Sequence, residues 1–226
     1  MRDGVRTLEN IMYAKYIKRF LDLSISFCAI VIAMPFFLIL TVLGVIFMKG
    51  NPFFTQARPG YHEKIFHLIK FRTMTNERGK DGKLLPDGKR LNKYGRFLRS
   101  TSLDELPELF NIFVGDMSLV GPRPLLKEYL PWYTKEEHRR HDVRPGLTGW
   151  AQVNGRNYLD WDHRFQKDVY YVDHVSFFFD LKVIFLTVKS VLSHSDVVED
   201  SRLVEPNFAQ QRREQLERQK ERGMKK

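Results

Sequence analysis

The hydrophobic pattern of the chain is dominated by one long apolar run near its beginning. From Leu21 to Met48 almost every residue is apolar, with Asp22 at the edge and Pro35 in the middle. As one α-helix this run would be roughly 42 Å long, more than the ~30 Å hydrocarbon core of a bilayer. It is too long for the core of a signal peptide, and no small-residue cleavage site follows it. The run therefore predicts a membrane helix.

Basic residues on both sides of the run indicate how it meets the membrane. The flanks carry Lys15, Lys18 and Arg19 before it and Lys49, Arg58 and Lys64 after it. The positive-inside rule favours both flanks on the cytoplasmic side, which one span cannot provide. Pro35 bends a helix, so the favoured prediction is a re-entrant helix-break-helix that enters the bilayer and returns. A tilted or kinked span and a buried soluble helix are the alternatives.

Beyond Asn51 the pattern changes to short segments typical of a soluble α+β region. Strands are predicted over 53–56 and 65–72, with a turn at Arg58-Pro59-Gly60 between them. Residues 76–90 are rich in glycine and charge, which indicates an exposed loop. Helices are predicted over 91–98, 105–113 and 124–140.

Two later segments have a less certain pattern. Residues 175–192 are apolar and rich in phenylalanine, but Asp180, Lys182 and Lys189 interrupt them. A helix lying in the membrane interface and a buried core helix both fit. After Pro206 the polar tail is a solvated helix or disorder, with no chemistry assigned. The predicted organisation is a membrane part over 1–50, a catalytic domain over 51–200 and a tail over 201–226.

Composition and charge narrow the choice of partners. Hydrophobic residues make up 43% of the chain and aromatic residues 13%, which supports a folded core. The 37 basic and 27 acidic residues give 37 − 27 = +10, so an anionic partner is expected: phosphorylated substrate, acidic lipid or nucleic acid. Cys28 is the only cysteine, which excludes an intrachain disulfide and fits a catalytic part facing the cytoplasm.

The candidate chemistry begins with Asp104-Glu105-Leu106-Pro107-Glu108. A helix tolerates Pro107 only in its first turn, so the helix cap is predicted at Asp104 rather than at Ser102. Taken alone, the pair fits an ordinary helix start. Near arginines, Asp104 could also stay ionised and act as a nucleophile, while Glu105 could ligate Mg²⁺.

Arginines near this pair have the geometry that phosphate recognition needs. Arg96 and Arg99 precede it, and Arg123 is held between two prolines that restrict its backbone. Each guanidinium offers planar, paired donors for phosphate oxygens. A second segment, 138–157, adds arginines and glycines, but its two histidines have no further partners for zinc. No Walker or Rossmann pattern is present.

Several motifs occur together along the chain and are specific as a series. They are Ala57-Arg58-Pro59-Gly60, Lys70-Phe71-Arg72-Thr73-Met74, Ser102-Leu103-Asp104-Glu105-Leu106-Pro107, Gly121-Pro122-Arg123-Pro124 and Arg144-Pro145-Gly146-Leu147-Thr148-Gly149. With them, the chain from about residue 19 to residue 192 resembles the bacterial sugar transferase family. The similarity is greatest to its small monotopic phosphoglycosyl transferases.

The resemblance implies a fold and a location. The expected fold is an α+β monotopic membrane protein with a re-entrant helix-break-helix, interfacial amphipathic helices and a small α/β catalytic domain. The expected location is the cytoplasmic face of the bacterial inner membrane. Met34 precedes Pro35 here, where small family members carry serine. The bend therefore lacks a hydroxyl that could satisfy freed carbonyl groups.

The resemblance also implies a reaction, the first membrane step of glycoconjugate and polysaccharide assembly. Asp104 attacks the β-phosphate of a UDP-sugar and expels UMP, and undecaprenyl phosphate then attacks the phosphosugar-aspartate. Glu105 helps to bind Mg²⁺, and the positions aligned with phosphate binding are Arg99, Arg123 and Arg156. An N-acetylated amino sugar is the expected donor group, with UDP-glucose and UDP-galactose left open.

Anionic membrane lipid is a further expected partner, and a homo-oligomer is left open. The alternative from another functional class is a membrane-tethered scaffold whose basic face binds anionic lipid or nucleic acid. Its basic residues are interspersed with acidic ones and no nucleic-acid fold signature is present, so no nucleic-acid partner is expected.

Overall fold

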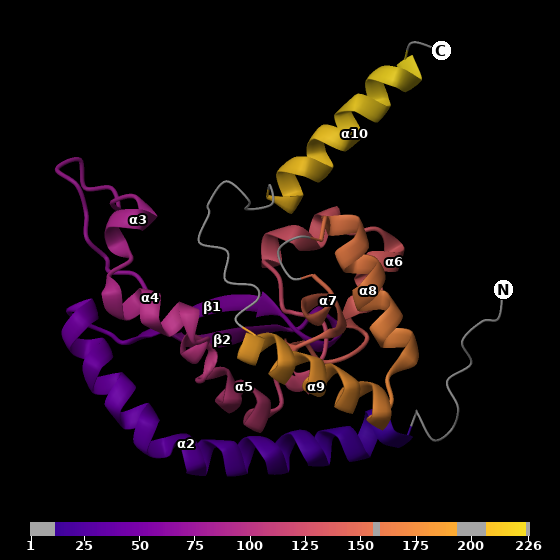
Figure 1. The fold of residues 1–226 in the computed structure, drawn as a ribbon. Helices are drawn as coiled ribbons and strands as arrows, with labels where there is room; N and C mark the ends of the chain where they lie inside the picture. Colours follow the sequence, from indigo (N-terminus) through magenta and orange to yellow (C-terminus); the bar gives the residue numbers. More distant parts are fainter. Residues whose placement is uncertain (1–11, 156–158, 194–206, 225–226) are drawn as a thin grey trace.

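The computed structural model describes residues 12–155, 159–193 and 207–224 (Figure 1). A π-helical turn, η1 (Tyr13–Ile17), leads into the long helix α2 (Lys18–Met48). Among the described residues this is the one helix long and apolar enough to cross a membrane. Pro35 lies inside α2, and the helix continues through it without a break. Figure 1 shows α2 passing beneath the body and then bending up along its side, as an internal proline can cause.

Both ends of α2 bond to the same body. At its beginning, Lys18 Nζ donates to Asp180 Oδ2 at 2.5 Å, and Asp22 Oδ1 accepts from the backbone N–H of Leu119 at 2.9 Å. Near its end, the Leu40 carbonyl accepts from the Tyr94 hydroxyl at 2.7 Å. The middle of the helix is mostly exposed and apolar. The two ends therefore lie against one body, although the helix is 31 residues long.

The predicted strand pair is confirmed as an antiparallel hairpin of β1 (Phe53–Pro59) and β2 (Ile65–Phe71). The predicted turn at Arg58-Pro59-Gly60 is wrong in position, because Arg58 and Pro59 still pair with Phe66 and Ile65. The chain reverses at the next residues instead. There His62 and Glu63 both have positive φ, and the short 3₁₀ turn η2 (Tyr61–Glu63) forms.

The segment after the hairpin follows its predicted character. Residues 76–90 form a largely exposed loop that ends in the short helix α3 (Asp87–Arg90). Helix α4 (Lys93–Ser100) begins where the Asn92 side chain accepts from the Gly95 N–H at 2.8 Å. A Cβ on Gly95 would lie 1.9 Å from the Thr73 carbonyl oxygen, so glycine is what lets α4 approach the end of the hairpin.

The prediction of one helix over 124–140 is wrong. The segment forms three short pieces: η4 (Lys127–Trp132), α6 (Lys135–His138) and η5 (Arg139–His141). Pro131 has no backbone N–H to continue an α-helix. Thr134 then starts a new helix, because it forms a reciprocal capping box with Glu137.

Two short parallel strands, β3 (Ser118–Val120) and β4 (Gly146–Thr148), form a second small sheet. A Cβ on Gly146 would lie 2.1 Å from the Gly121 nitrogen, so the pairing depends on glycine at both positions. Helices α5 (Glu108–Val114), α7 (Trp150–Val153) and α8 (Trp161–His174) pack around the two sheets.

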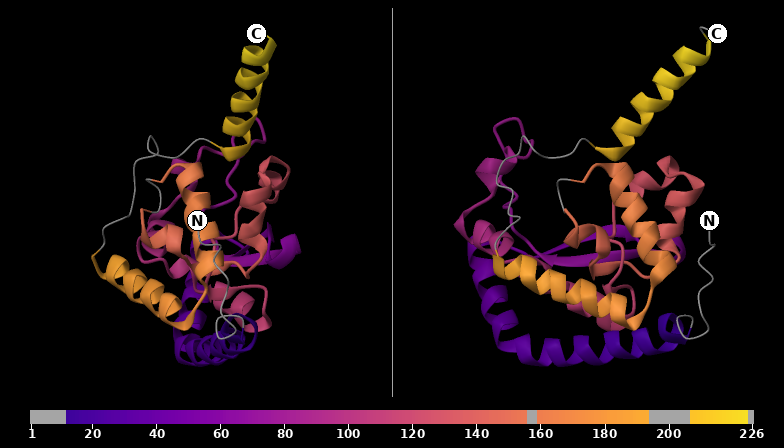
Figure 2. Two further views of the ribbon diagram at one scale, coloured as in Figure 1. Left: turned by 90° about the vertical axis from the view of Figure 1, so that its right-hand side faces the viewer. Right: turned by 45° about the vertical axis from the view of Figure 1, so that its right-hand side comes forward.

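The last two helices lie at the end of the chain. Helix α9 (Phe177–Ser193) buries Val183 but leaves Phe178 78% and Phe185 69% exposed, so it packs on the body with one face and carries an exposed apolar face on the other. Helix α10 (Phe208–Met224) forms within the polar tail. Figure 2 shows that only the beginning of α10 meets the body and that the rest projects away.

Candidate active site

The predicted nucleophile and metal ligand lie on a 3₁₀ turn, η3 (Leu103–Glu105), between α4 and α5. The predicted cap at Asp104 is wrong. Ser102 precedes the turn in the left-handed conformation, and the α-helical hydrogen bonds begin only after Pro107. Pro107 is tolerated because it precedes the first residue of α5, where its missing N–H costs nothing. The Asp104 side chain is therefore not used as a helix cap.

Glu105 is held by two cations from separate parts of the chain. Its Oε1 accepts from Lys70 Nζ of β2 at 2.7 Å and from Arg123 Nη2 at 2.5 Å. Burial alone would raise the pKa of this carboxyl. The charges and hydrogen bonds of Arg123 and Lys70 outweigh burial and lower the pKa to about 2. Glu105 is therefore ionised over the whole physiological pH range.

Lys70 also approaches Glu108, the last residue of the pentad. Lys70 Nζ lies 3.0 Å from Glu108 Oε1, and the Glu108 side chain is 2% exposed. Burial raises the pKa of Glu108, and the charge of Glu105 adds to the rise, against the opposing effect of Lys70. One lysine thus contacts two carboxylates, and Glu105 has Arg123 as a second cation.

Asp104 differs from its neighbour in both contacts and charge. No residue in the described part of the chain donates a hydrogen bond to its carboxylate. Burial raises its pKa, and Glu105 adds to the rise, while Lys70, Arg123 and Arg99 act in the opposite direction. The nearby cations were expected to keep Asp104 ionised, but Lys70 and Arg123 form their hydrogen bonds with Glu105 instead. Asp104 is left as a partly buried carboxylate whose oxygens accept no hydrogen bond from the part of the chain that the structure describes.

The arginines divide into those at the site and those beside it. Arg123 joins Glu105, and this pairing raises the pKa of its guanidinium. Arg58 is half-buried, and burial and the charge of Arg123 both lower its pKa. Arg99 donates to Thr73 Oγ1 at 3.1 Å and is close enough to Asp104 to lower the pKa of that carboxyl. Neighbouring guanidiniums of this kind favour a bound anion.

Arg123 is itself supported from behind. Arg140, buried in η5, donates from Nη2 to the Arg123 carbonyl at 2.8 Å and to Asp168 Oδ2 at 2.7 Å. Next to it, burial and the charge of Arg140 lower the pKa of His141 to about 3, so this ring is neutral. Its Nδ1 lies 3.3 Å from the Gly60 carbonyl. His141 therefore has a packing role in this segment.

The helix after the carboxylates is held at its middle and near its C-terminal end. Asn111 donates from Nδ2 to the His67 carbonyl at 2.8 Å and accepts from the Ile69 N–H at 3.0 Å, so it bonds α5 to the edge of β2. Arg19 of α2 donates to the carbonyls of Ile112 and Phe113 at the end of α5. Helix α2 and strand β2 together therefore hold the helix that follows η3.

The residues present fit a magnesium ion in one respect, the carboxylate oxygens of Asp104 and Glu105 that no described contact uses. The described residues contain no group of three or more His, Cys, Asp or Glu side chains that could hold a metal. Mg²⁺ commonly takes one or two protein carboxylates and completes its shell with water and substrate phosphate. Every described contact of Glu105 falls on Oε1. Its other oxygen and those of Asp104 are thus suited to such an ion.

The structure thus gathers Asp104, Glu105 and Arg123, with Arg99 nearby. Arg156 lies outside the described residues, and Pro35 lies within α2, away from these groups in sequence and on another element. Lys70, Glu108 and Arg58 are site residues for which the sequence predicted no individual role. All three lie in the motifs or the pentad quoted above, and that position was the available signal for them.

Comparison with known proteins identifies a family. Residues 13–194 match the family model described as bacterial sugar transferase. The chain is 53% identical to the uncharacterized sugar transferase EpsL of Bacillus subtilis (strain 168) over 173 residues, which are 76% of this chain and 86% of that one.

Two longer relatives carry more specific names. Identity is 37% over 198 residues to the undecaprenyl-phosphate galactose phosphotransferase of Salmonella typhimurium, covering 79% of this chain and 41% of that one. It is 38% over 187 residues to the UDP-glucose:undecaprenyl-phosphate glucose-1-phosphate transferase of Klebsiella pneumoniae, covering 76% and 39%. The chain thus spans about two fifths of their length. It belongs to the bacterial sugar transferase family, a family of enzymes.

Proposed function

We propose that this enzyme transfers a sugar-1-phosphate from a UDP-sugar to undecaprenyl phosphate and releases UMP. The observation that carries the proposal is the asymmetry of the carboxylate pair. Glu105 is held by Lys70 and Arg123, whereas Asp104 beside it accepts no hydrogen bond from the described residues. One carboxylate is thus available for bonding to phosphorus while the other is fixed in place.

The proposed reaction has two displacements. An Asp104 oxygen bonds to the β-phosphorus of the UDP-sugar, and the bond from that phosphorus to the bridging oxygen breaks, so UMP leaves with the oxygen. An oxygen of undecaprenyl phosphate then bonds to the same phosphorus, and the Asp104 carboxylate leaves. Desolvation, which raises the Asp104 pKa, also strengthens it as a nucleophile.

The cations around the pair supply phosphate binding in this proposal. Arg123 offers paired donors to oxygens that gain charge as the phosphoryl group is transferred. Arg99 and Arg156 are proposed as further phosphate ligands. Glu105 is proposed to hold Mg²⁺ through its Oε2, and the ion would neutralise diphosphate charge.

We also propose a membrane arrangement for this site. Helix α2 and the exposed phenylalanines of α9 provide apolar surface. Since both ends of α2 bond to one body, the helix is proposed to enter and leave the same face of the bilayer, the cytoplasmic face of the inner membrane. This arrangement brings a soluble donor and a lipid acceptor to one carboxylate. Anionic lipid is the proposed partner of the surrounding basic residues.

An N-acetylated amino sugar is the proposed group on the donor. The relatives' names mention galactose, glucose and N-acetylgalactosamine. A screen of UDP-sugars with undecaprenyl phosphate, following UMP release, tests the choice.

The decisive variant is Asp104→Asn in the full-length protein. Amide nitrogen and oxygen cannot replace the carboxylate nucleophile, so UMP release is expected to fall by roughly 1,000-fold or more. The matched control is Asp87→Asn, because the Asp87 side chain is 75% exposed at the start of α3; it should retain wild-type activity. Near-normal UMP release from the Asp104 variant would refute the proposed nucleophile. Salt-sensitive binding to anionic vesicles with no UDP-sugar turnover would favour the scaffold alternative.

A further inference from the structure

The first turn of α10 is attached to the body although most of this helix projects away from it (Figure 2). Asn207 Oδ1 accepts from the Ala209 N–H at 3.0 Å and so caps the helix. Phe208 is 2% exposed, and Arg212 forms ion pairs one turn later. We call residues 207–212 the C-terminal docking segment. It lies beyond residues 13–194, which the family model matches.

Phe208 completes an aromatic cluster. Its ring centroid lies 5.0 Å from that of Phe165 and 5.5 Å from that of Tyr133. The rings of Trp161 and Tyr129 lie 5.3 and 5.4 Å away. Aromatic pairs at such separations stabilise one another beyond the effect of buried area. Without Phe208, the side of the cluster that faces α10 would be open to water.

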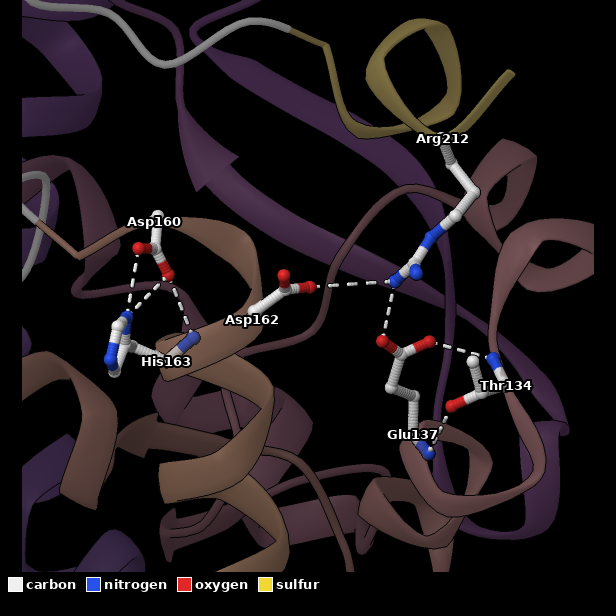
Figure 3. A network of polar contacts seen from close by, with 6 residues as sticks. All are labelled: Thr134, Glu137, Asp160, Asp162, His163 and Arg212. Atoms are coloured by element: carbon white, nitrogen blue, oxygen red, sulfur yellow. Dashed lines mark hydrogen bonds and ion pairs between the residues drawn. The ribbon is translucent and has the colours of Figure 1, made fainter. Parts of the chain in front are cut away.

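Arg212 attaches the segment to a second place. Its Nη2 donates to Glu137 Oε1 at 2.5 Å and lies 3.8 Å from Asp162 Oδ1. The other oxygen of Glu137 accepts from the Thr134 N–H at 2.6 Å, which is half of the capping box of α6. Figure 3 shows Arg212 between these two carboxylates. The ion pair therefore fixes the start of α6.

Both attachments converge on Arg140. The Arg140 guanidinium lies 5.9 Å from the centre of the Tyr133 ring and 5.7 Å from that of Phe165, two rings that pack on Phe208. Arg140 also lies in η5, the turn that follows α6 directly. Its Nη2 donates to the Arg123 carbonyl at 2.8 Å, and Arg123 in turn holds Glu105. A continuous set of contacts thus joins α10 to the candidate site.

We propose that the C-terminal docking segment positions Arg123 through Arg140, so that Phe208 and Arg212 are positioning residues for phosphoryl transfer. The inference rests on the proposed function. Arg123 lies between two prolines, and the hydrogen bond from Arg140 fixes the remaining freedom of its carbonyl. A displacement of a positioning group by about 1 Å can lower the rate roughly 100-fold.

The test compares Phe208→Ala and Arg212→Gln with Arg218→Gln in the full-length protein. Each docking variant should lower kcat for UMP release by roughly 10-fold or more. The expected loss stays below the roughly 100-fold loss that a displacement of a positioning group by about 1 Å can cause. Phe208→Leu and Arg212→Lys should restore part of the loss, because they keep an apolar group or a cation. Arg218→Gln should match the wild type, since the Arg218 side chain is 73% exposed.

A double-mutant cycle with Arg123→Lys separates positioning from a general loss of stability. If Phe208 acts through Arg123, Phe208→Ala should change kcat less than about 2-fold in the Arg123→Lys background. An undiminished effect there would overturn the proposal. So would a loss of activity that only follows the unfolded fraction, measured by thermal unfolding. A wild-type protein that releases no UMP would refute the proposed function and this inference together, whereas an active wild type with unaffected docking variants refutes the inference alone.

Discussion

At the scale of single residues, Lys70 is the least replaceable group near the carboxylates. It contacts both Glu105 and the buried Glu108. Lys70→Met should destabilise the protein by about 3–5 kcal/mol, because removing one partner leaves a buried carboxylate unpaired. Adding Glu108→Gln should restore much of this stability, since the amide carries no charge. Denaturant unfolding in detergent measures both effects. Equal stability of Lys70→Met and the wild type would contradict this account.

The residues that the sequence predicted are those with a local signature. Asp104 and Glu105 are adjacent in a pentad, and Arg123 lies between prolines, so each could be selected without knowing the fold. Lys70 could not be assigned in this way, because its role depends on β2 lying beside η3. The local sequence also could not show which of the two carboxylates, Asp104 or Glu105, pairs with the cations. Lys70 and Arg123 reach Glu105 from separate parts of the chain, while burial and the charge of Glu105 raise the pKa of Asp104 against the smaller effects of these cations.

At the scale of elements, the Asn111 side chain joins α5 to β2. Its amide forms one donated and one accepted hydrogen bond with the β2 backbone, the kind of bonds that a neighbouring strand forms. Asn111→Leu keeps the size but leaves the Ile69 N–H and the His67 carbonyl unpaired, so a loss of about 2–5 kcal/mol is expected. Asn111→Asp should lose less, because it keeps the acceptor for Ile69. The control is Val114→Thr, an exposed position on the same helix. Hydrogen exchange should show that the Ile69 amide loses protection in Asn111→Leu; unchanged protection would contradict the assigned role.

Elements with a strong periodic pattern were predicted, and those made by long-range contacts were not. The long apolar helix, the first hairpin and the helix over the phenylalanine-rich segment follow from hydrophobic runs. Strands β3 and β4 have three residues each, too few to show a pattern. They form because two glycines allow backbones distant in sequence to meet. The helix predicted over 124–140 failed because Pro131 and the cap at Thr134 interrupt a segment whose composition is otherwise helical.

At the scale of the whole molecule, the contacts at both ends of α2 lead to a topology test. Cysteines replacing Arg2 and Asn51, introduced separately into a Cys28→Ser background, should resist an impermeant maleimide in intact spheroplasts and react after permeabilisation. Cys28 must be removed because it is exposed. A cysteine replacing Lys83, in the exposed loop, provides the control for the cytoplasmic side. Labelling of the position-2 cysteine from outside would make α2 a true span.

The ion pair between Lys18 and Asp180 also sets an order of events during synthesis. The two residues are 162 positions apart, so a ribosome adding ~5–20 residues per second needs roughly 10–30 s to make the second after the first. During that interval Lys18, the first residue of α2, lacks the Asp180 carboxylate with which it later pairs. The hydrogen bonds of α2 to Tyr94, Ile112 and Leu119 can form earlier in synthesis. The beginning of α2 is therefore expected to be fully held only when α9 leaves the ribosome and supplies Asp180.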